Sequence, residues 1–215
     1  MKFKMIFLLV FCFVQANAQK SKAELDVLFQ KNVDSIVDEL RFNYQYDQAL
    51  REYIFYKTFD KSATDSLENL EYEAKKKYVF SHNFKTNMEK RIWNEFIDPA
   101  SDKATESLIR VSKEFGFPSL GRIKKFYNGI LPDDEEFNPT IIFIHANPQY
   151  YQQIQELVTE QFEQGIIGSC DYGYIMWHVT GREESKYLDD NGIKNGKGKK
   201  DGKVYLVFPC VDEYN

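Results

Sequence analysis

The feature that most constrains the fold of this chain is a long segment without helix-breaking residues. No glycine or proline occurs in the 80 residues from Gln19 to Asp98. Within this segment, apolar side chains recur at intervals of three or four residues: Leu25, Phe29, Val33, Ile36 and Leu40. Because an α-helix has about 3.6 residues per turn, this spacing places them on one helical face. We therefore predict a long amphipathic helix that begins near Lys22.

Later segments show the same periodicity and predict the fold class. Ser62 and Thr64 are alternative N-caps for a second helix. The Asp98-Pro99 step indicates that one helix stops and another begins, and the next apolar stripe ends at Gly116, a residue type common just after a helix. We predict a mainly α protein, a single-domain helical bundle over residues 19–215 that starts with a long helical hairpin.

The C-terminal region differs in composition. Val204 to Phe208 is rich in β-branched and aromatic residues, for which we predict a strand within a small β element near the C-terminus. The preceding residues 192–203 are dense in lysine and glycine but lack the glycine and lysine spacing of a phosphate-binding loop. We predict that this segment is a flexible surface loop.

The N-terminus indicates export. Lys2 and Lys4 precede an apolar run from Met5 to Val14, and Ala16-Asn17-Ala18 has the small residues of a signal-peptidase site. We predict that residues 1–18 are a signal peptide and that the protein is periplasmic or secreted. The apolar run is shorter than the roughly 20 residues that a membrane-spanning helix needs. We therefore expect that the protein is not an integral membrane protein after the signal peptide is cleaved.

Two cysteines, Cys170 and Cys210, remain after the predicted cleavage. An even number of cysteines in an exported protein is typical of a disulfide bond. Two separate buried thiols are equally consistent with the sequence, because free cysteine packs as a small apolar residue. The sequence leaves both interpretations open.

The overall composition limits the classes of partner. Hydrophobic residues make up 43% of the chain and charged residues 28%, which is typical of a folded protein with a core. The formal net charge is −5, so we expect no nucleic-acid partner. The sequence leaves the identity of any other partner, and of any cofactor, unknown.

Two charged residues interrupt the first apolar stripe. Extended beyond Leu40 with the same spacing, the stripe passes through Asp47 and Arg51 before it reaches Ile54. Residues four apart are neighbours on a helix, and a lone buried charge is very costly. We therefore predict a mostly buried ion pair between Asp47 and Arg51. Its role is either structural or that of a polar floor to a binding pocket, with Gln48 beside it.

Two histidines also lie on apolar faces. His145 follows a run of isoleucines, and His178 follows Tyr174 by four residues. Each histidine is either a hydrogen-bonded core residue or a functional group whose partner sets its tautomer. We predict His145 and His178 as candidate catalytic residues and Tyr174 as a candidate binding residue. No pair of histidines has metalloprotease spacing, so the sequence predicts no metal site.

Several short motifs occur in a fixed order. They are Asp47-Gln48-Ala49-Leu50-Arg51, the turn Gly116-Phe117-Pro118, then Gly121, then His145-Ala146, then Gln152 and Gln153. Together they resemble a bacterial family of uncharacterised proteins, domain of unknown function 6624, over about residues 44–181. The chain departs from that pattern at Ile144, where the family usually has Gln, and at Asn147, where Asp is usual. His178-Val179 falls near a usual Asp-Arg pair. The resemblance implies no activity.

These observations support two classes of function. The absence of a nucleophile elbow of the Gly-x-Ser-x-Gly type favours an exported binding or interaction module. The alternative is a small hydrolase-like enzyme that uses His145 with Asp47 and Arg51, joined by His178. A concave pocket lined by these side chains would favour the enzyme, and dispersed, fully packed positions would favour the module.

Overall fold

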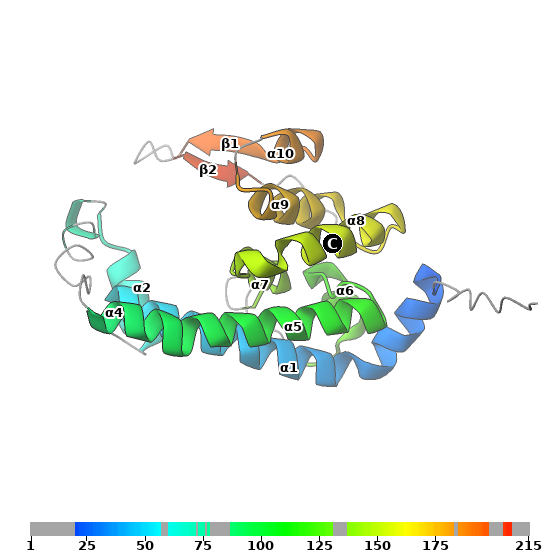
Figure 1. Cartoon of the computed structure of the whole chain (residues 1–215), viewed down its shortest axis with the longest axis horizontal. Helices are drawn as coiled ribbons and strands as arrows, with labels where there is room; N and C mark the ends of the chain where they lie inside the picture. The colour runs from blue at the N-terminus through cyan, green and yellow to red at the C-terminus, as the bar shows by residue number, and fades with distance from the viewer. Residues whose placement is uncertain are drawn as a thin grey trace, which may run out of the picture.

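The computed structural model describes residues 20–56, 60–71, 73–75, 77, 87–130, 137–182, 185–197 and 204–207. These residues are mainly helical, which confirms the predicted class (Figure 1). The predicted signal peptide, residues 1–18, lies outside the described residues. Within the described ranges, no helix has both the length and the apolar character that are needed to cross a membrane.

The described elements follow one another along the chain in this order. The α-helices are α1 (Lys22–Tyr56), α2 (Lys61–Glu68), α4 (Asn87–Ile92), α5 (Asp98–Phe115), α6 (Leu120–Phe126), α7 (Pro139–Ile144), α8 (Tyr151–Glu163), α9 (Ser169–Val179) and α10 (Lys186–Asp190). A π-helical turn, η1 (Trp93–Ile97), joins α4 to α5, and a 3₁₀ turn, η2 (Pro148–Tyr150), precedes α8. The strands are β1 (Lys194–Lys197) and β2 (Val204–Val207).

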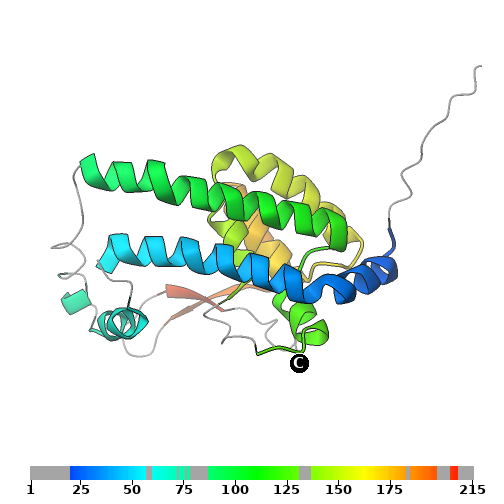
Figure 2. The same cartoon turned by 90° about the horizontal axis from the view of Figure 1, so that it is seen from below.

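The 35-residue helix α1 packs along a second long helical segment that runs in the opposite direction (Figures 1 and 2). This segment consists of α4, η1 and α5 in direct succession. The predicted second helix corresponds to the short α2, so it is not the partner of α1. A long apolar stripe is covered best by a partner of similar length, and residues 87–115 supply that partner.

The predicted start of a helix at Asp98-Pro99 is confirmed, because α5 begins there. The predicted stop before it is wrong, because the π-helical turn continues the helical path into α5. The Asp98 N–H donates to the Trp93 carbonyl oxygen, five residues back, as in a π-helix. Pro99 then lies in the first turn of α5. Proline is tolerated in the first turn of a helix, because a backbone N–H at that position would have no acceptor within the helix. The π-helical turn therefore joins two helices that the sequence alone separates.

The core lies where α8 and α9 cover the α1–α5 pair. Its fully buried side chains come from all four helices and include Phe29, Leu40, Leu108, Ile154 and Ile175. Full burial of one such side chain contributes roughly 1.5–3 kcal/mol relative to an exposed position. In Figure 2, α8 and α9 lie against the middle of the long pair, which leaves the C-terminal end of α1 outside this core.

The two strands pair in antiparallel register, with Lys194 opposite Val207 and Lys197 opposite Val204. Strand β1 thus lies inside residues 192–203, for which the sequence predicts a flexible loop, and over Lys194–Lys197 that prediction is wrong. Lysine and glycine have a low intrinsic preference for strands. The pairing is decided by backbone hydrogen bonds to β2, which the local composition of β1 does not reveal.

A small second cluster connects this strand pair to the helices. It contains Cys170, Leu188 and Ile193, with Tyr174 and Trp177 packed against it. The Cys170 sulfur is in a disulfide bond, so it is not a free thiol. Cys210 lies outside the described residues, and its pairing with Cys170 stays a prediction.

Candidate functional site

Helix α1 brings three of the predicted residues to one place. Asp47 and Arg51 are one helical turn apart, and Gln48 follows Asp47 directly. The Arg51 Nε donates to Asp47 Oδ2 at 2.8 Å, so the predicted ion pair is present. The side chain of Asp47 is 5% exposed and that of Arg51 is 18% exposed. The pair is therefore mostly shielded from water, although it lies near the end of the helix that the main core does not cover.

Asp47 is held by donors from its own helix, from α5 and from the end of α7. Its Oδ1 accepts from the Ser101 hydroxyl of α5 at 2.8 Å. Its Oδ2 accepts from Arg51, from the Gln48 amide nitrogen at 3.2 Å, and from His145 Nδ1 at 2.7 Å. Both carboxylate oxygens are thus satisfied, as a buried charge requires.

The pKa of Asp47 reflects this balance. Burial by itself raises the pKa of the carboxyl group, because it disfavours the charged form. The hydrogen bonds from His145 and Arg51, together with their charges, act in the opposite direction and hold the pKa below its usual value. Asp47 is therefore a stable anion at neutral pH.

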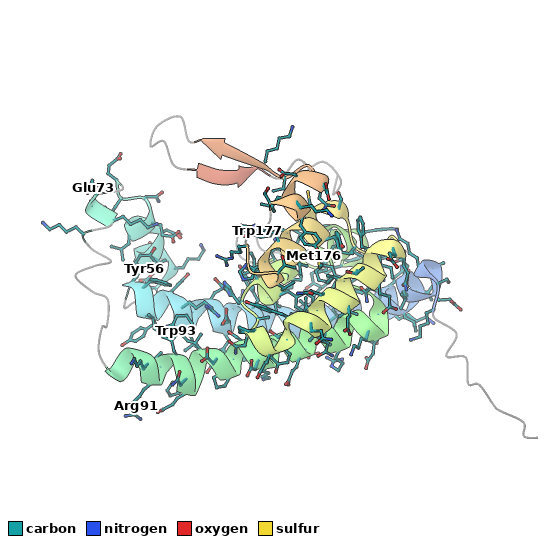
Figure 3. The ribbon with its side chains drawn as sticks, turned by 45° about the horizontal axis from the view of Figure 1, so that its top comes forward. Tyr56, Glu73, Arg91, Trp93, Met176 and Trp177 are labelled. Carbon is teal, nitrogen blue, oxygen red and sulfur yellow. The ribbon has the colours of Figure 1, made fainter. Side chains whose placement is uncertain are left out.

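The Arg51 guanidinium is fixed by α5 and by the π-helical turn. Its Nη2 donates to Ser101 Oγ at 2.8 Å, and its Cζ lies 5.2 Å from the centroid of the Trp93 ring. Figure 3 shows Trp93 between α1 and the α4–η1–α5 segment. These two contacts hold the Arg51 guanidinium against Asp47, so Arg51 is not a mobile surface charge.

His145 reaches Asp47 from α7. Asn138 caps this helix, its side chain accepting from the Thr140 N–H at 3.0 Å. His145 is the residue that ends the helix, and its N–H still donates to the Ile141 carbonyl at 2.9 Å. The imidazole is thereby placed beside Asp47, 98 residues away in sequence.

The contact with Asp47 selects the histidine tautomer. A carboxylate only accepts hydrogen bonds, so His145 Nδ1 carries the hydrogen in the 2.7 Å contact. The Gln48 amide nitrogen, 3.2 Å from Nδ1, then donates to Asp47 and not to the ring. In the neutral ring, the Nε2 atom keeps its lone pair, and it has no hydrogen-bond partner among the described residues.

His145, Gln48 and Arg51 line a cleft of about 790 Å³ between α1, α2 and α7. The walls combine aromatic and acidic side chains: Tyr44, Phe55, Tyr56, Glu52, Asp65 and Glu68. In Figure 3, Tyr56 lies at the C-terminal end of α1, next to α2. A concave pocket of the kind that would favour an enzyme is thus present. The predicted Gln48, Arg51 and His145 line it, and Asp47 contacts all three without lining the cleft itself.

The second histidine has a different environment. His178 is 7% exposed, and Arg182 Nε donates to its Nδ1 at 3.1 Å. Burial, then the charge of Arg182, then His145 lower its pKa to about 4. Arg182 also lies over the Trp177 ring, which is labelled on α9 in Figure 3. His178 is therefore neutral at physiological pH and is poorly suited to hold a proton during catalysis.

Tyr174, the remaining predicted binding residue, belongs to the small second cluster. Its ring stacks on Trp177 at a centroid distance of 6.0 Å, and burial raises the pKa of its hydroxyl. The cleft lining named above comes from α1, α2 and α7 and does not include Tyr174 of α9. Tyr174 therefore does not line the cleft that Gln48, Arg51 and His145 line. In the part of the chain described, no group of three or more His, Cys, Asp or Glu side chains is placed to hold a metal ion.

Sequence reasoning missed Ser101 and Trp93. Ser101 is 2% exposed and interrupts the buried stripe of α5 that continues with Ala104 and Leu108. A polar residue on an apolar stripe was the signal that identified Asp47, and the same test applied to α5 would have found Ser101. Trp93 has no such signal, because the π-helical turn changes which face it lies on.

Comparisons with models of known protein families, with curated proteins and with solved structures found no match to this chain. The resemblance to domain of unknown function 6624 is neither supported nor contradicted, and it stays a prediction. The function is therefore argued from the site alone.

Proposed function

We propose that this protein is a hydrolase-like enzyme in which His145 acts as a general base on water in the cleft. The observation that carries the proposal is the 2.7 Å contact between His145 Nδ1 and Asp47, at a cleft that His145 itself lines. An anionic partner at Nδ1 fixes the ring orientation and stabilises the positive charge that the ring gains when it accepts a proton.

The proposed step needs no covalent intermediate. His145 Nε2 accepts a proton from a water molecule, the water oxygen attacks the substrate, and the leaving group departs with a proton returned by the imidazolium. Ser101 is not the nucleophile in this scheme, because its hydroxyl donates to Asp47 and accepts from Arg51. The role of Arg51 is to position Asp47, since its Nε and Nη2 point at Asp47 and Ser101.

A panel of chromogenic esters, phosphate esters, amides and glycosides tests the proposal. We expect turnover of one class, reduced at least about 100-fold in His145→Gln, because removal of a general base typically costs 10²–10⁴ in rate. Asp47→Asn should reduce it similarly, since a neutral amide no longer selects the tautomer. Gln153→Ala, on the exposed face of α8, is the matched control and should retain full activity.

Two outcomes would contradict the proposed hydrolase-like activity. One is a wild-type protein that turns over no member of the panel, and the other is a His145→Gln protein with unchanged turnover. Melting temperatures of all variants separate loss of chemistry from loss of folding.

A binding module is the second candidate, and one observation favours it. Among the described residues, the structure places no free nucleophile beside His145, and the one hydroxyl of the network is already engaged. In that case the same cleft would bind a small polar molecule without turnover, and His145→Gln would weaken binding while no product forms.

We also propose that the protein works outside the cytoplasm. The support is the order of charged, apolar and Ala-x-Ala segments in residues 1–18. Mass spectrometry of protein purified from its native source should find an N-terminus at Gln19. Material that retains Met1 would contradict export by this route.

A further inference from the structure

A second cleft lies near the opposite end of α1. It has a volume of about 520 Å³ and is formed by the first turns of α1, by α6 and by the segment Gly165–Gly168 (Figure 1 shows α6 beside this part of α1). Lys22, which lines it, and Asp47 are 25 residues apart on α1. At a rise of about 1.5 Å per residue, the two sites are roughly 37 Å apart along the helix.

The charges around this cleft are unusual for an acidic protein. Four cationic side chains line it, Lys22, Arg122, Lys124 and Lys125, and the lining contains one carboxylate, that of Asp26. The whole chain has a net charge of −5. Cations gathered in a concave site repel one another and attract an anion, and the surrounding walls concentrate that field. We call these residues the basic cleft.

Arg122 has hydrogen-bonding capacity that the protein leaves unused. Its side chain is 7% exposed, its Nε donates to Asp26 Oδ1 at 2.9 Å, and its Nη1 donates to the Phe117 carbonyl at 3.3 Å. The guanidinium lies over the Phe29 ring, 4.2 Å from the centroid. Its Nη2 is buried and has no hydrogen-bond partner among the described residues. A buried donor without an acceptor is rare and destabilising.

The rim of the basic cleft holds its lysines in place. Lys22 Nζ donates to the Gly165 carbonyl at 2.6 Å, and Lys125 Nζ lies 4.8 Å from the centroid of the Phe126 ring. A Cβ atom added at Gly165 would meet nothing within 4 Å, so this wall is open. Two of the lysines that line the basic cleft are therefore each held by a neighbouring group, and the guanidinium that lines it is buried.

We propose that the basic cleft binds a small molecule that carries a phosphate or diphosphate group. Lys124 has a further interaction of its own and is left out of the balance. Among the other described lining residues, Lys22, Arg122 and Lys125 against Asp26 leave about two positive charges, which matches a phosphate or diphosphate group better than a singly charged carboxylate. Phosphate oxygens are also the usual partners of lysine and of the planar arginine fork. The volume lies in the range typical of small-molecule sites and exceeds the needs of a single inorganic phosphate.

Isothermal titration calorimetry with inorganic pyrophosphate tests this proposal on the full chain at low salt. We expect saturable binding to one site, about threefold weaker in Lys22→Gln and in Lys125→Gln, and about tenfold weaker in the double variant. Lys31→Gln is the matched control, an exposed lysine on α1 away from the cleft, and should bind as the wild type does. Affinity should fall as salt is added, because exposed charges are screened.

Titrations with ADP and sulfate identify the ligand chemistry. ADP binding at least as tight as pyrophosphate would support an organic diphosphate, and pyrophosphate binding alone would support the inorganic ion. Sulfate binding as tight as pyrophosphate would overturn the proposal, as would the absence of saturable binding or an equal loss of affinity in Lys31→Gln. Melting temperatures show whether each variant is folded. Neither lysine belongs to the Asp47 site, so this result is independent of the proposed enzyme activity.

Discussion

Two arginine–aspartate pairs anchored on α1 define the two ends of this molecule, and they differ in how completely they are satisfied. Asp47 accepts hydrogen bonds on both oxygens from Arg51, Ser101, Gln48 and His145. Arg122 pairs with Asp26 but keeps one buried nitrogen that has no hydrogen-bond partner in the described part of the chain.

The difference indicates what each end is built to do. At the Asp47 end, the protein itself compensates the buried charge, and one product of that arrangement is an oriented imidazole. At the Arg122 end, compensation among the described residues is incomplete, and the basic cleft that Arg122 lines is where we propose that an anion binds. A fully satisfied buried network fixes the geometry of its members, whereas an unsatisfied buried donor has an energetic cost.

Replacing the arginine of each pair with methionine should give the largest effect and tests this contrast. We expect Arg51→Met to reduce the free energy of unfolding by about 3 kcal/mol, because it leaves a buried carboxylate without its cation. Arg122→Met should cost only about 1 kcal/mol, because the Asp26 side chain is 23% exposed and regains water. Urea denaturation measures both values.

An exposed charge on the same helix provides the control for these substitutions. Lys31→Met removes one exposed charge from α1. It should change the free energy of unfolding by less than about 0.5 kcal/mol. Equal losses in Arg51→Met and Arg122→Met would contradict the idea that the two ends differ.

The pH dependence of stability should sharpen the comparison with a smaller effect. The pKa of His178, beside the Asp47 end, is lowered to about 4, so the unfolded chain binds a proton at about pH 6.5 that the folded protein does not. The stability that neutral His178 contributes is fully present above about pH 6.5 and is lost as the pH falls toward 4.

Between pH 7.5 and 5.5 we expect a loss of about 1 kcal/mol that is absent in His178→Gln. The measurement is urea denaturation of both proteins at the two pH values. An identical loss in His178→Gln would assign the effect to other groups. Asp47, whose pKa is lowered, contributes stability that is lost only as the pH falls through the ordinary carboxyl pKa, about 4, and below.

Parts of the candidate site were predictable because they depend on spacing along one helix. Asp47 and Arg51 stand four residues apart on an apolar stripe, and this was enough to predict a buried ion pair. His145 was found by the same reasoning, as a polar residue on an apolar face. His178 shows the limit of that reasoning, because the sequence pattern is the same but burial, and then the charge of Arg182, lower the pKa of His178 and change its role.

Other features depend on contacts between distant segments and had no local signal. The π-helical turn carried the helix through Asp98-Pro99 and placed Trp93 against Arg51. Strand β1 formed in a lysine- and glycine-rich segment because β2 paired with it. The basic cleft joins Lys22 to residues about 100 and 145 positions later, so its charge is invisible in any single segment.

The sequence by itself therefore determined the helical class, the long first helix and the two polar interruptions of its apolar face. These follow from periodicity, because 3.6 residues per turn convert spacing into a shared face. The tertiary structure alone decided which residues meet: Ser101 and His145 with Asp47, and Arg122 with Asp26. Those contacts arise from the packing of α5, α6 and α7 on α1, and a buried charge selects its partners by distance in space, not by distance along the chain.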